Sequence, residues 1–240
     1  MATPLSPDKL LAALKAEGLN VREYKSWRTH RRPASAGAFG SINGVMTHHT
    51  VTGPGTDVVA LCYNGHASLP GPLCQGVIKK DGSVWLTSAG RSNHAGLGDA
   101  DVLRAVIAED YGDYPPTDNQ ANTDGNRHFY GFECENLGDG KDPWPKAQYV
   151  AMVKANAAIL RAYGWTAKSA IAHKEWQPGK VDPAGIDMKK FRADIAACLK
   201  LPPGKWGVAP APPAPKPALT VEQRLAALEK RVTTLESKVQ

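Results

Sequence analysis

The chain has 240 residues, of which 42% are apolar and 22% are charged. This length allows one large domain or one domain with an appendage, and the composition excludes wholesale disorder and a membrane protein. The formal net charge of +6 is uneven: residues 1–45 carry a net +4, residues 46–200 a net −1, and residues 201–240 a net +3. The basic ends favour attraction to an anionic surface, although lysine and arginine that only aid solubility explain them equally well.

The N-terminal segment predicts a helix. The first eight residues contain neither a basic stretch nor an apolar one, so we expect no secretory signal and no membrane anchor. Ser6-Pro7 has the cap-then-proline pattern of a helix start, and Gly18 is a stop. The apolar face of this helix is formed by Leu10, Leu11 and Leu14.

The middle of the chain mixes strands and helices. Strands are predicted at residues 42–50, 75–79, 84–87, 129–135 and 170–172, and the Asp81-Gly82 turn joins the second and third as a hairpin. Residues 146–163 are predicted to form a long amphipathic helix, with Tyr149, Val153, Asn156, Leu160 and Tyr163 on one face. A further helix is predicted at 187–199. The loop at 112–127 is long for a connector and is expected to border a binding cleft.

The C-terminal part differs in composition. Residues 1–200 are predicted to form one domain, and residues 201–218 a proline- and alanine-rich, semi-rigid linker. Residues 219–240 repeat apolar side chains at heptad spacing, which predicts a short coiled-coil helix. Because one such helix is marginal alone, we expect it to self-associate as a parallel dimer or trimer, or else to dock on its own domain or another protein.

The four cysteines show no metal-binding spacing. Cys62, Cys74, Cys134 and Cys198 are too sparse for a disulfide scaffold and contain no CxxC pair. They are interpreted as buried thiols of a protein made in a reducing compartment, with a bridge between Cys62 and Cys74 as the alternative.

Three places carry residues suited to catalysis. In the His48-His49 pair, strand alternation sends the two rings to opposite faces. His173 and Asp182 are joined by a segment with Pro178-Gly179, which must be a loop able to bring an imidazole and a carboxylate together. Two histidines and one carboxylate are the ligands of a catalytic zinc site that leaves its fourth position to water. Glu133 and Glu135 are predicted to project from one face of an apolar strand.

Each place also has a plain interpretation. A His-His pair is more often a partly buried polar pair than a metal site, and Asp182-Pro183 fits a helix cap followed by proline. Glu133 and Glu135 fit an edge strand facing solvent. The HExxH pattern is absent, because no histidine follows His173 at the required distance. Spacing alone therefore supports only a weak metallohydrolase hypothesis.

Four ordered motifs change this balance. VMTHHT (45–50), SNHAG (92–96), YGFECEN (130–136) and AHKEWQPGKVDP (172–183) resemble the zinc-dependent N-acetylmuramoyl-L-alanine amidases of the type 2 amidase and peptidoglycan-recognition-protein family. The similarity spans roughly residues 20–200, and segments 73–78 and 89–96 most resemble endolysins of actinobacterial phages. The resemblance implies an α/β fold with a central mixed β-sheet flanked by helices.

The resemblance also implies roles for individual residues. One zinc ion would be held by His48, His173 and Asp182, with His49 pointing away. Glu133 would be the general base and Lys180 the cation facing the oxyanion, while His94 and Glu135 are expected to contact substrate, with Glu135 as the fallback base. The sequence departs from a branch of phage amidases that carries a catalytic tyrosine, since Cys74 and Gln75 stand there.

The implied activity is cleavage of the amide between N-acetylmuramic acid and the L-alanine of the stem peptide. The alternatives are a module that binds peptidoglycan without cutting it, a zinc endopeptidase or deacetylase on the same polymer, and an assembly protein built on the C-terminal coil. Expected partners are peptidoglycan and anionic wall polymers, without nucleic acid or membrane. As implied for an endolysin, the protein would accumulate in the host cytoplasm and reach the wall after membrane permeabilisation.

Overall fold

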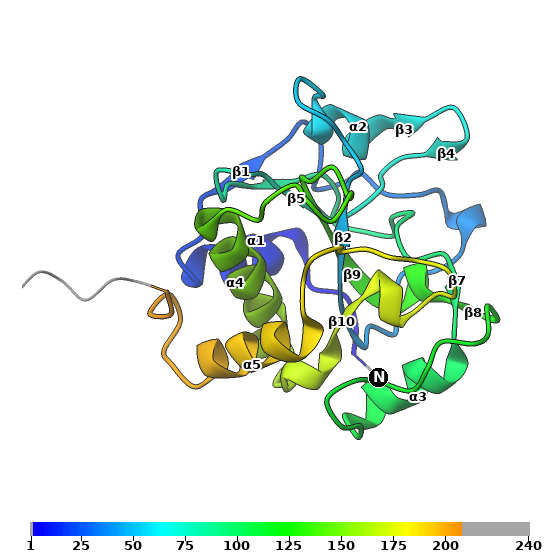
Figure 1. The fold of residues 1–240 in the computed structure, drawn as a ribbon. Helices are drawn as coiled ribbons and strands as arrows, with labels where there is room; N and C mark the ends of the chain where they lie inside the picture. The colour runs from blue at the N-terminus through cyan, green and yellow to red at the C-terminus, as the bar shows by residue number, and fades with distance from the viewer. Residues whose placement is uncertain (1, 208–240) are drawn as a thin grey trace, which may run out of the picture. The chain divides into compact units, whose positions relative to one another are not determined.

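The computed structural model describes residues 2–207 (Figure 1). The end of the predicted linker and the predicted heptad helix at 219–240 lie outside the described residues. Within the described part, no helix is long and apolar enough to cross a membrane. The helices are α1 (Pro7–Ala16), α2 (Val58–Asn64), α3 (Ala100–Ala108), α4 (Lys146–Tyr163) and α5 (Met188–Leu199).

A six-stranded mixed sheet forms the centre. Its order is β1 (Val21–Glu23), β6 (Val84–Leu86), β5 (Gly76–Ile78), β9 (Phe129–Cys134), β2 (Gly44–His49) and β10 (Ala170–Ala172). All neighbours run parallel except β5 and β6, the predicted hairpin. Two short hairpins lie outside the sheet, β3 (Gly65–His66) with β4 (Leu69–Pro70), and β7 (Leu97–Gly98) with β8 (Thr123–Asp124). The predicted fold class, a mixed sheet flanked by helices, is confirmed.

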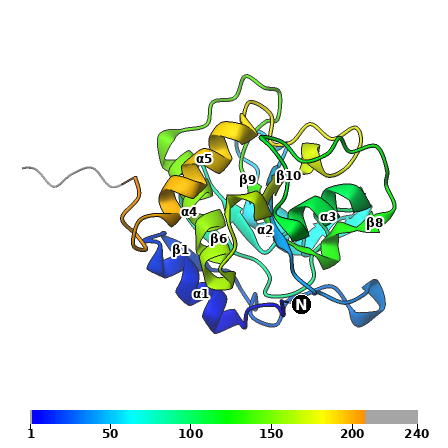
Figure 2. The same ribbon diagram turned by 90° about the horizontal axis from the view of Figure 1, so that it is seen from below.

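Strand alternation divides the core between the two faces of the sheet. Val45 and Thr47 of β2 point to the face covered by α1, α4 and α5, where Asn156 of α4 donates a hydrogen bond to the Thr47 hydroxyl (3.2 Å). Met46 and His48 point to the other face, where α3 packs on Met46 and Phe129. Figure 2 shows α1, α4 and α5 on one side of the sheet and α3 on the other.

Helix α4 has the predicted bounds but is buried over more than one face. The predicted stripe is present, and residues 151–160 are all buried because α1 and α5 flank the helix and the sheet lies beneath it. Gly164 ends the helix in the left-handed conformation (φ 73°), which glycine adopts without strain.

The second face carries two smaller apolar clusters instead of one. One contains α3 with Met46, Phe129 and Trp176, and the other contains α2 with Leu73 and Val77. His48 and Glu133 are register partners on β2 and β9 and share this face. The polar residues of the predicted site therefore lie on the face whose core is split.

The loop at 112–127 folds against the start of α3. Asp99, the N-cap of α3, accepts hydrogen bonds from the backbone amides of Asn119 and Gln120 (2.8 and 3.0 Å). The loop ends in β8 and in a short 3-10 turn at Gly125–Arg127. None of its residues lines the cavity described below, so the expectation that it borders the cleft is wrong for that cavity.

Candidate metal centre

The candidate site lies at the carboxyl ends of three parallel strands. His48 is the last residue but one of β2, Glu133 holds the same place in β9, and His173 directly follows β10. Parallel strands bring their carboxyl ends to one edge, where α/β sheets commonly bind ligands. Residues far apart in the sequence therefore meet at one edge of the sheet.

Three buried side chains converge there. His48, His173 and Asp182 are 1%, 6% and 7% exposed, and their ligand atoms face one another. His48 Nδ1 lies 3.1 Å from His173 Nδ1 and 3.0 Å from Asp182 Oδ2, and His173 Nδ1 lies 3.1 Å from Asp182 Oδ2. Ligands of a tetrahedral zinc ion, with bonds of about 2.0–2.1 Å, are separated by roughly 3.3 Å. The three atoms are thus spaced as zinc ligands.

Protonation supports the same conclusion. The Nε2 of His173 lies 3.0 Å from the side-chain oxygen of Gln177, which only accepts, so this contact favours a hydrogen on Nε2 and leaves Nδ1 as the nitrogen that faces the other two ligand atoms. Burial lowers the pKa of His48 to about 4, which keeps that ring neutral near pH 7. A neutral ring and a carboxylate around one point form a donor set that fits a divalent cation.

The loop from His173 to Asp182 is fixed at both ends. The Lys174 amide donates to the Asp182 carbonyl (2.9 Å), and the Lys174 ammonium donates to the Ile186 carbonyl (2.8 Å). Trp176 is fully buried and donates from Nε1 to the Ala95 carbonyl (3.0 Å). A Cβ at Gly98 would lie 2.2 Å from the Trp176 ring, so only glycine leaves room for this anchor.

Glu133 points toward the cavity beside the three ligands, whereas Glu135 does not. Glu133 lines the cavity, and its Oε2 is buried without a hydrogen-bond partner. Burial raises the pKa of Glu133 well above its ordinary value, and Lys180 opposes that rise. Glu135 follows the end of β9 and accepts from the Lys80 amide (3.1 Å). The two glutamates do not share a face, because the strand that would have aligned them ends at Cys134.

The cavity around these groups has a volume of about 400 Å³. Lys180 is exposed at its wall, and three exposed aliphatic side chains, Val51, Leu69 and Val181, line it as well. Val51 has a φ of 49°, a left-handed conformation that is costly for a β-branched residue. Strain of this kind clusters at functional sites.

His94 and His49 both touch the site from its sides. His94 lines the cavity, is 8% exposed, and places Nδ1 3.0 Å from Nε2 of His48. His49 is turned from the three ligands by strand alternation, and its Nδ1 accepts from the Ala184 amide (3.1 Å). The sequence motif indicated His94 but not its contact with His48.

Cys74 and Gln75, which the sequence comparison set against a tyrosine, do not line the cavity. Gln75 is buried and accepts from the Gly131 amide (2.5 Å) while donating to the Gly90 carbonyl (2.7 Å). Cys74 is buried and lies 3.4 Å from the Thr87 hydroxyl. All four cysteines are buried free thiols.

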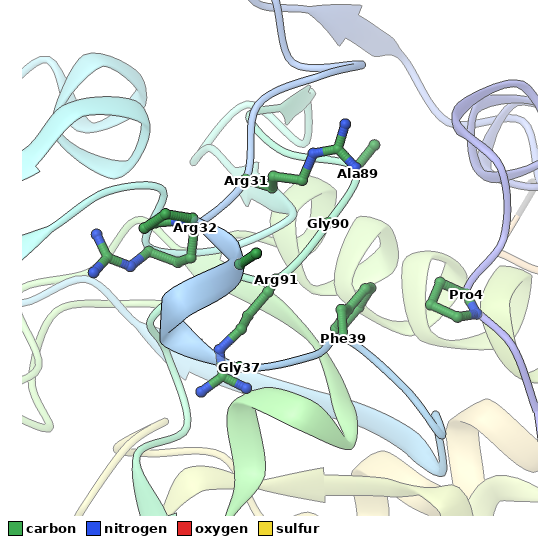
Figure 3. A pocket seen from close by; sticks show the side chains of 10 residues that line it. Pro4, Arg31, Arg32, Gly37, Phe39, Ala89, Gly90 and Arg91 are labelled. Atoms are coloured by element: carbon green, nitrogen blue, oxygen red, sulfur yellow. The ribbon is translucent and has the colours of Figure 1, made fainter.

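A second hollow, of about 500 Å³, shares no lining residue with the metal centre. Arg31, Arg32 and Arg91 surround it together with Pro4 and Phe39, and no acidic residue lines it. Figure 3 shows the three guanidinium groups pointing in different directions. The buried Nε atoms of Arg32 and Arg91 have no hydrogen-bond partner. This hollow contains no histidine or carboxylate and is unsuited to the chemistry of the metal centre.

Comparison with protein-family models decides the family. Residues 38–185, more than half of the chain, match the model described as N-acetylmuramoyl-L-alanine amidase. This chain belongs to the N-acetylmuramoyl-L-alanine amidase family. The amidase is therefore a peptidoglycan hydrolase, and the matched residues include all three candidate metal ligands, Glu133 and Lys180.

The amidase also resembles solved structures at low sequence identity. One is the endolysin amidase LysCS from Clostridium intestinale, at 15% identity and a TM-score of 0.48, covering 73% of this chain and 94% of that chain. Another is a mutant endolysin from Bacillus subtilis, at 14% and 0.49, covering 74% and 99%. A third is the Ph2119 endolysin of a Thermus scotoductus bacteriophage, at 14% and 0.46, covering 73% and 99%. No curated protein sequence matches the amidase.

Proposed function

We propose that this amidase is a zinc-dependent phage endolysin that separates N-acetylmuramic acid from the L-alanine of the stem peptide. The observation that carries the zinc proposal is the convergence of His48 Nδ1, His173 Nδ1 and Asp182 Oδ2 at 3.0–3.1 Å. These three residues would hold the ion. Zinc bound there supplies a Lewis acid for the amide carbonyl and lowers the pKa of a water molecule toward about 7.

Glu133 is suited to move the proton. Glu133 lines the cavity, its buried Oε2 has no hydrogen-bond partner, and burial raises its pKa, which brings the carboxylate closer to the strength that a general base needs near neutral pH. Glu133 accepts a proton from the attacking water as the carbonyl carbon gains the water oxygen. It then returns that proton to the nitrogen of L-alanine as the carbon–nitrogen bond breaks, so the products are a lactyl carboxylate and a free amine.

Lys180 is suited to stabilise the developing negative charge. Its ammonium stands at the cavity wall two residues before Asp182. A fixed cation or donor facing an oxyanion is typically worth about 10²–10³-fold in turnover.

Substrate contacts are proposed at the cavity mouth. The exposed side chains of Val51 and Val181, 70% and 63% exposed, offer apolar surface to the lactyl and alanyl methyl groups. His94 lines the cavity and stays a predicted substrate contact. Glu135 stays one too, although only through substrate that extends beyond the cavity toward Lys80.

The endolysin role is supported by the motifs at 73–78 and 89–96, which resemble those of actinobacterial phage endolysins. The protein would then accumulate in the host cytoplasm and act on the wall once the membrane is opened. We further propose that residues 219–240 associate two or three copies and raise avidity for the wall.

The arginine-lined hollow supports the proposed attraction to anionic wall polymers. Residues 24–39 contain four lysine or arginine side chains and no acidic one. All four precede the family match, which begins at residue 38. The Arg91 guanidinium is paired with the Asp124 carboxylate (2.7 Å), so Arg31 and Arg32, whose guanidinium groups point in different directions, are the cations that an extended polyanion would meet. Replacing Arg31 and Arg32 by glutamine should weaken binding to whole walls in low salt and leave hydrolysis of a soluble muropeptide unchanged. If the variant binds whole walls as tightly as the wild type, these arginines only aid solubility.

Two measurements test the main proposal. Mass analysis of digested wall should give intact glycan strands with free lactyl carboxylates and stem peptides beginning at L-alanine. Cleavage inside the peptide would indicate an endopeptidase, loss of acetate a deacetylase, and no product a binding module. Hydrolysis should stop after complete metal removal and return with zinc; undiminished peptide release would overturn the zinc proposal.

A further inference from the structure

We infer that His94 is a positioning residue that holds His48 in the one tautomer able to bind a metal ion. The inference rests on the proposed function, since it concerns how the chain prepares one ligand of the proposed zinc site. It assigns His94 an action through His48, in addition to the substrate contact predicted from the sequence.

A backbone carbonyl fixes the position of the hydrogen on the His94 ring. His94 Nε2 lies 3.0 Å from the Phe129 carbonyl oxygen, which can only accept. His94 Nε2 therefore carries the ring hydrogen, and the Nδ1 of the same imidazole is a lone pair that can accept. That lone pair lies 3.0 Å from His48 Nε2, so His48 donates from Nε2 and its Nδ1 is left bare.

Without this acceptor the opposite tautomer would be favoured. His48 Nδ1 lies 3.0 Å from the Asp182 carboxylate, and a hydrogen on Nδ1 would form a charge-assisted hydrogen bond there. Such a bond would occupy both His48 Nδ1 and Asp182 Oδ2, two of the three ligand atoms. His94 competes with Asp182 for the single hydrogen of His48 and keeps it away from the metal position.

The surroundings of His94 are shaped to hold its ring in place. Asn126 Oδ1 accepts from the backbone amides of His94 and Ala95 at 2.8 Å each. A Cβ at Gly131 would lie 2.6 Å from His94 Cγ and Nδ1, so the glycine of β9 leaves the space that the ring fills. The His94 ring is therefore held through the hydrogen bond of its backbone amide, through the contact of Nε2 with the Phe129 carbonyl, and through the space above Gly131.

The first experiment reads the tautomer directly in the metal-free protein. Nitrogen-15 chemical shifts of the histidine rings should show His48 protonated at Nε2 and bare at Nδ1 in the wild type. In His94→Leu the hydrogen should move to Nδ1. His128→Leu is the matched control, since His128 is a half-buried histidine that contacts Ser41 and Asn43 but no ligand, and it should leave His48 unchanged.

The second experiment measures zinc affinity by competition with a chelator. Loss of a residue that orients a metal ligand typically costs 10–100-fold in affinity, and we expect that loss in His94→Leu but not in His128→Leu. His94→Asn keeps an acceptor near His48 Nε2 and should recover most of the affinity. Gly131→Ala, which displaces the ring without removing it, should weaken zinc binding in the same direction and serves if His94→Leu does not fold.

The inference is overturned if folded His94→Leu, or Gly131→Ala in its place, keeps both the His48 tautomer and the zinc affinity of the wild type. Failure of the proposed function looks different. Wild type that binds no zinc contradicts the proposed metal, while the tautomer measurement still decides the role of His94.

Discussion

The two faces of the sheet differ in how they are covered. On the first face α1, α4 and α5 bury one continuous apolar core. On the second face α2 and α3 cover separate clusters, and His48 and Glu133 of the candidate metal centre point to this same face. The first face therefore supplies most of the hydrophobic stabilisation, whereas the second gathers the titratable side chains of the candidate site, among them Glu133, whose buried Oε2 has no hydrogen-bond partner.

The largest effect on turnover is expected for His173→Ala. Removing this ligand should abolish zinc binding and lower activity about a thousandfold or more, since a metal ion contributes several kcal/mol to such a reaction and each 1.4 kcal/mol is tenfold. Metal content and peptide release check this together. His128→Ala is the control and should retain both; a metal-free His173→Ala with full activity would contradict the assignment.

The second largest effect is expected for Glu133→Gln, which should lower turnover by about 10²–10⁴-fold, the usual contribution of a general base. Zinc content should stay at the wild-type level, because the side chain is not among the three ligands. Glu135→Gln is the matched variant from the same strand end and should keep kcat, because a substrate contact outside the cavity affects KM. A greater loss in Glu135→Gln would make Glu135 the base.

Lys180→Gln should lower turnover less and should also change its pH dependence. The Lys180 cation lowers the pKa of Glu133, so its removal raises that pKa further. Glu133 is active as the carboxylate, and the fall of activity on the acid side should therefore move to higher pH. A pH profile of kcat/KM on a soluble muropeptide measures this, with the exposed Lys146→Gln as control; an unmoved profile would separate Lys180 from Glu133.

Ile159→Ala on the first face should leave the turnover of the folded protein unchanged. Ile159 of α4 is fully buried, and truncation of such a side chain costs about 2–5 kcal/mol of the free energy of unfolding. Ile107→Ala on α3, where the side chain is 55% exposed, should cost about 0.5 kcal/mol or less. Denaturant unfolding beside activity checks both, and a turnover defect in folded Ile159→Ala would show that the two faces are coupled.

Much of the fold could be predicted from the sequence. Helix α4 and strand β10 have their predicted bounds, because a long apolar periodicity and a short apolar run with clear ends specify them. Helices α2 and α3 were not predicted. Their signals are short, although Asp57 and Asp99 cap them and apolar residues follow at helical spacing.

The site was less accessible from the sequence. Residue spacing left the metal interpretation weak, and resemblance to a family supplied the ligand set. Glu133 and Glu135 could not be separated, since alternation holds only while a strand continues and β9 ends between them. The contact of His94 with His48 joins residues 46 positions apart, and only the folded chain brings them within 3.0 Å.

The last described residues lie on the first face. The Gly204 amide donates to Glu17 (3.1 Å), Arg161 donates to the Leu201 carbonyl (3.1 Å), and Gly207 lies against Val150 of α4. The chain thus leaves the domain beside α1 and α4, whereas the cavity opens on the opposite face of the sheet. A fusion made at residue 207 is therefore expected to leave hydrolysis of a soluble muropeptide unchanged, because the attachment point is not among the residues that line the cavity.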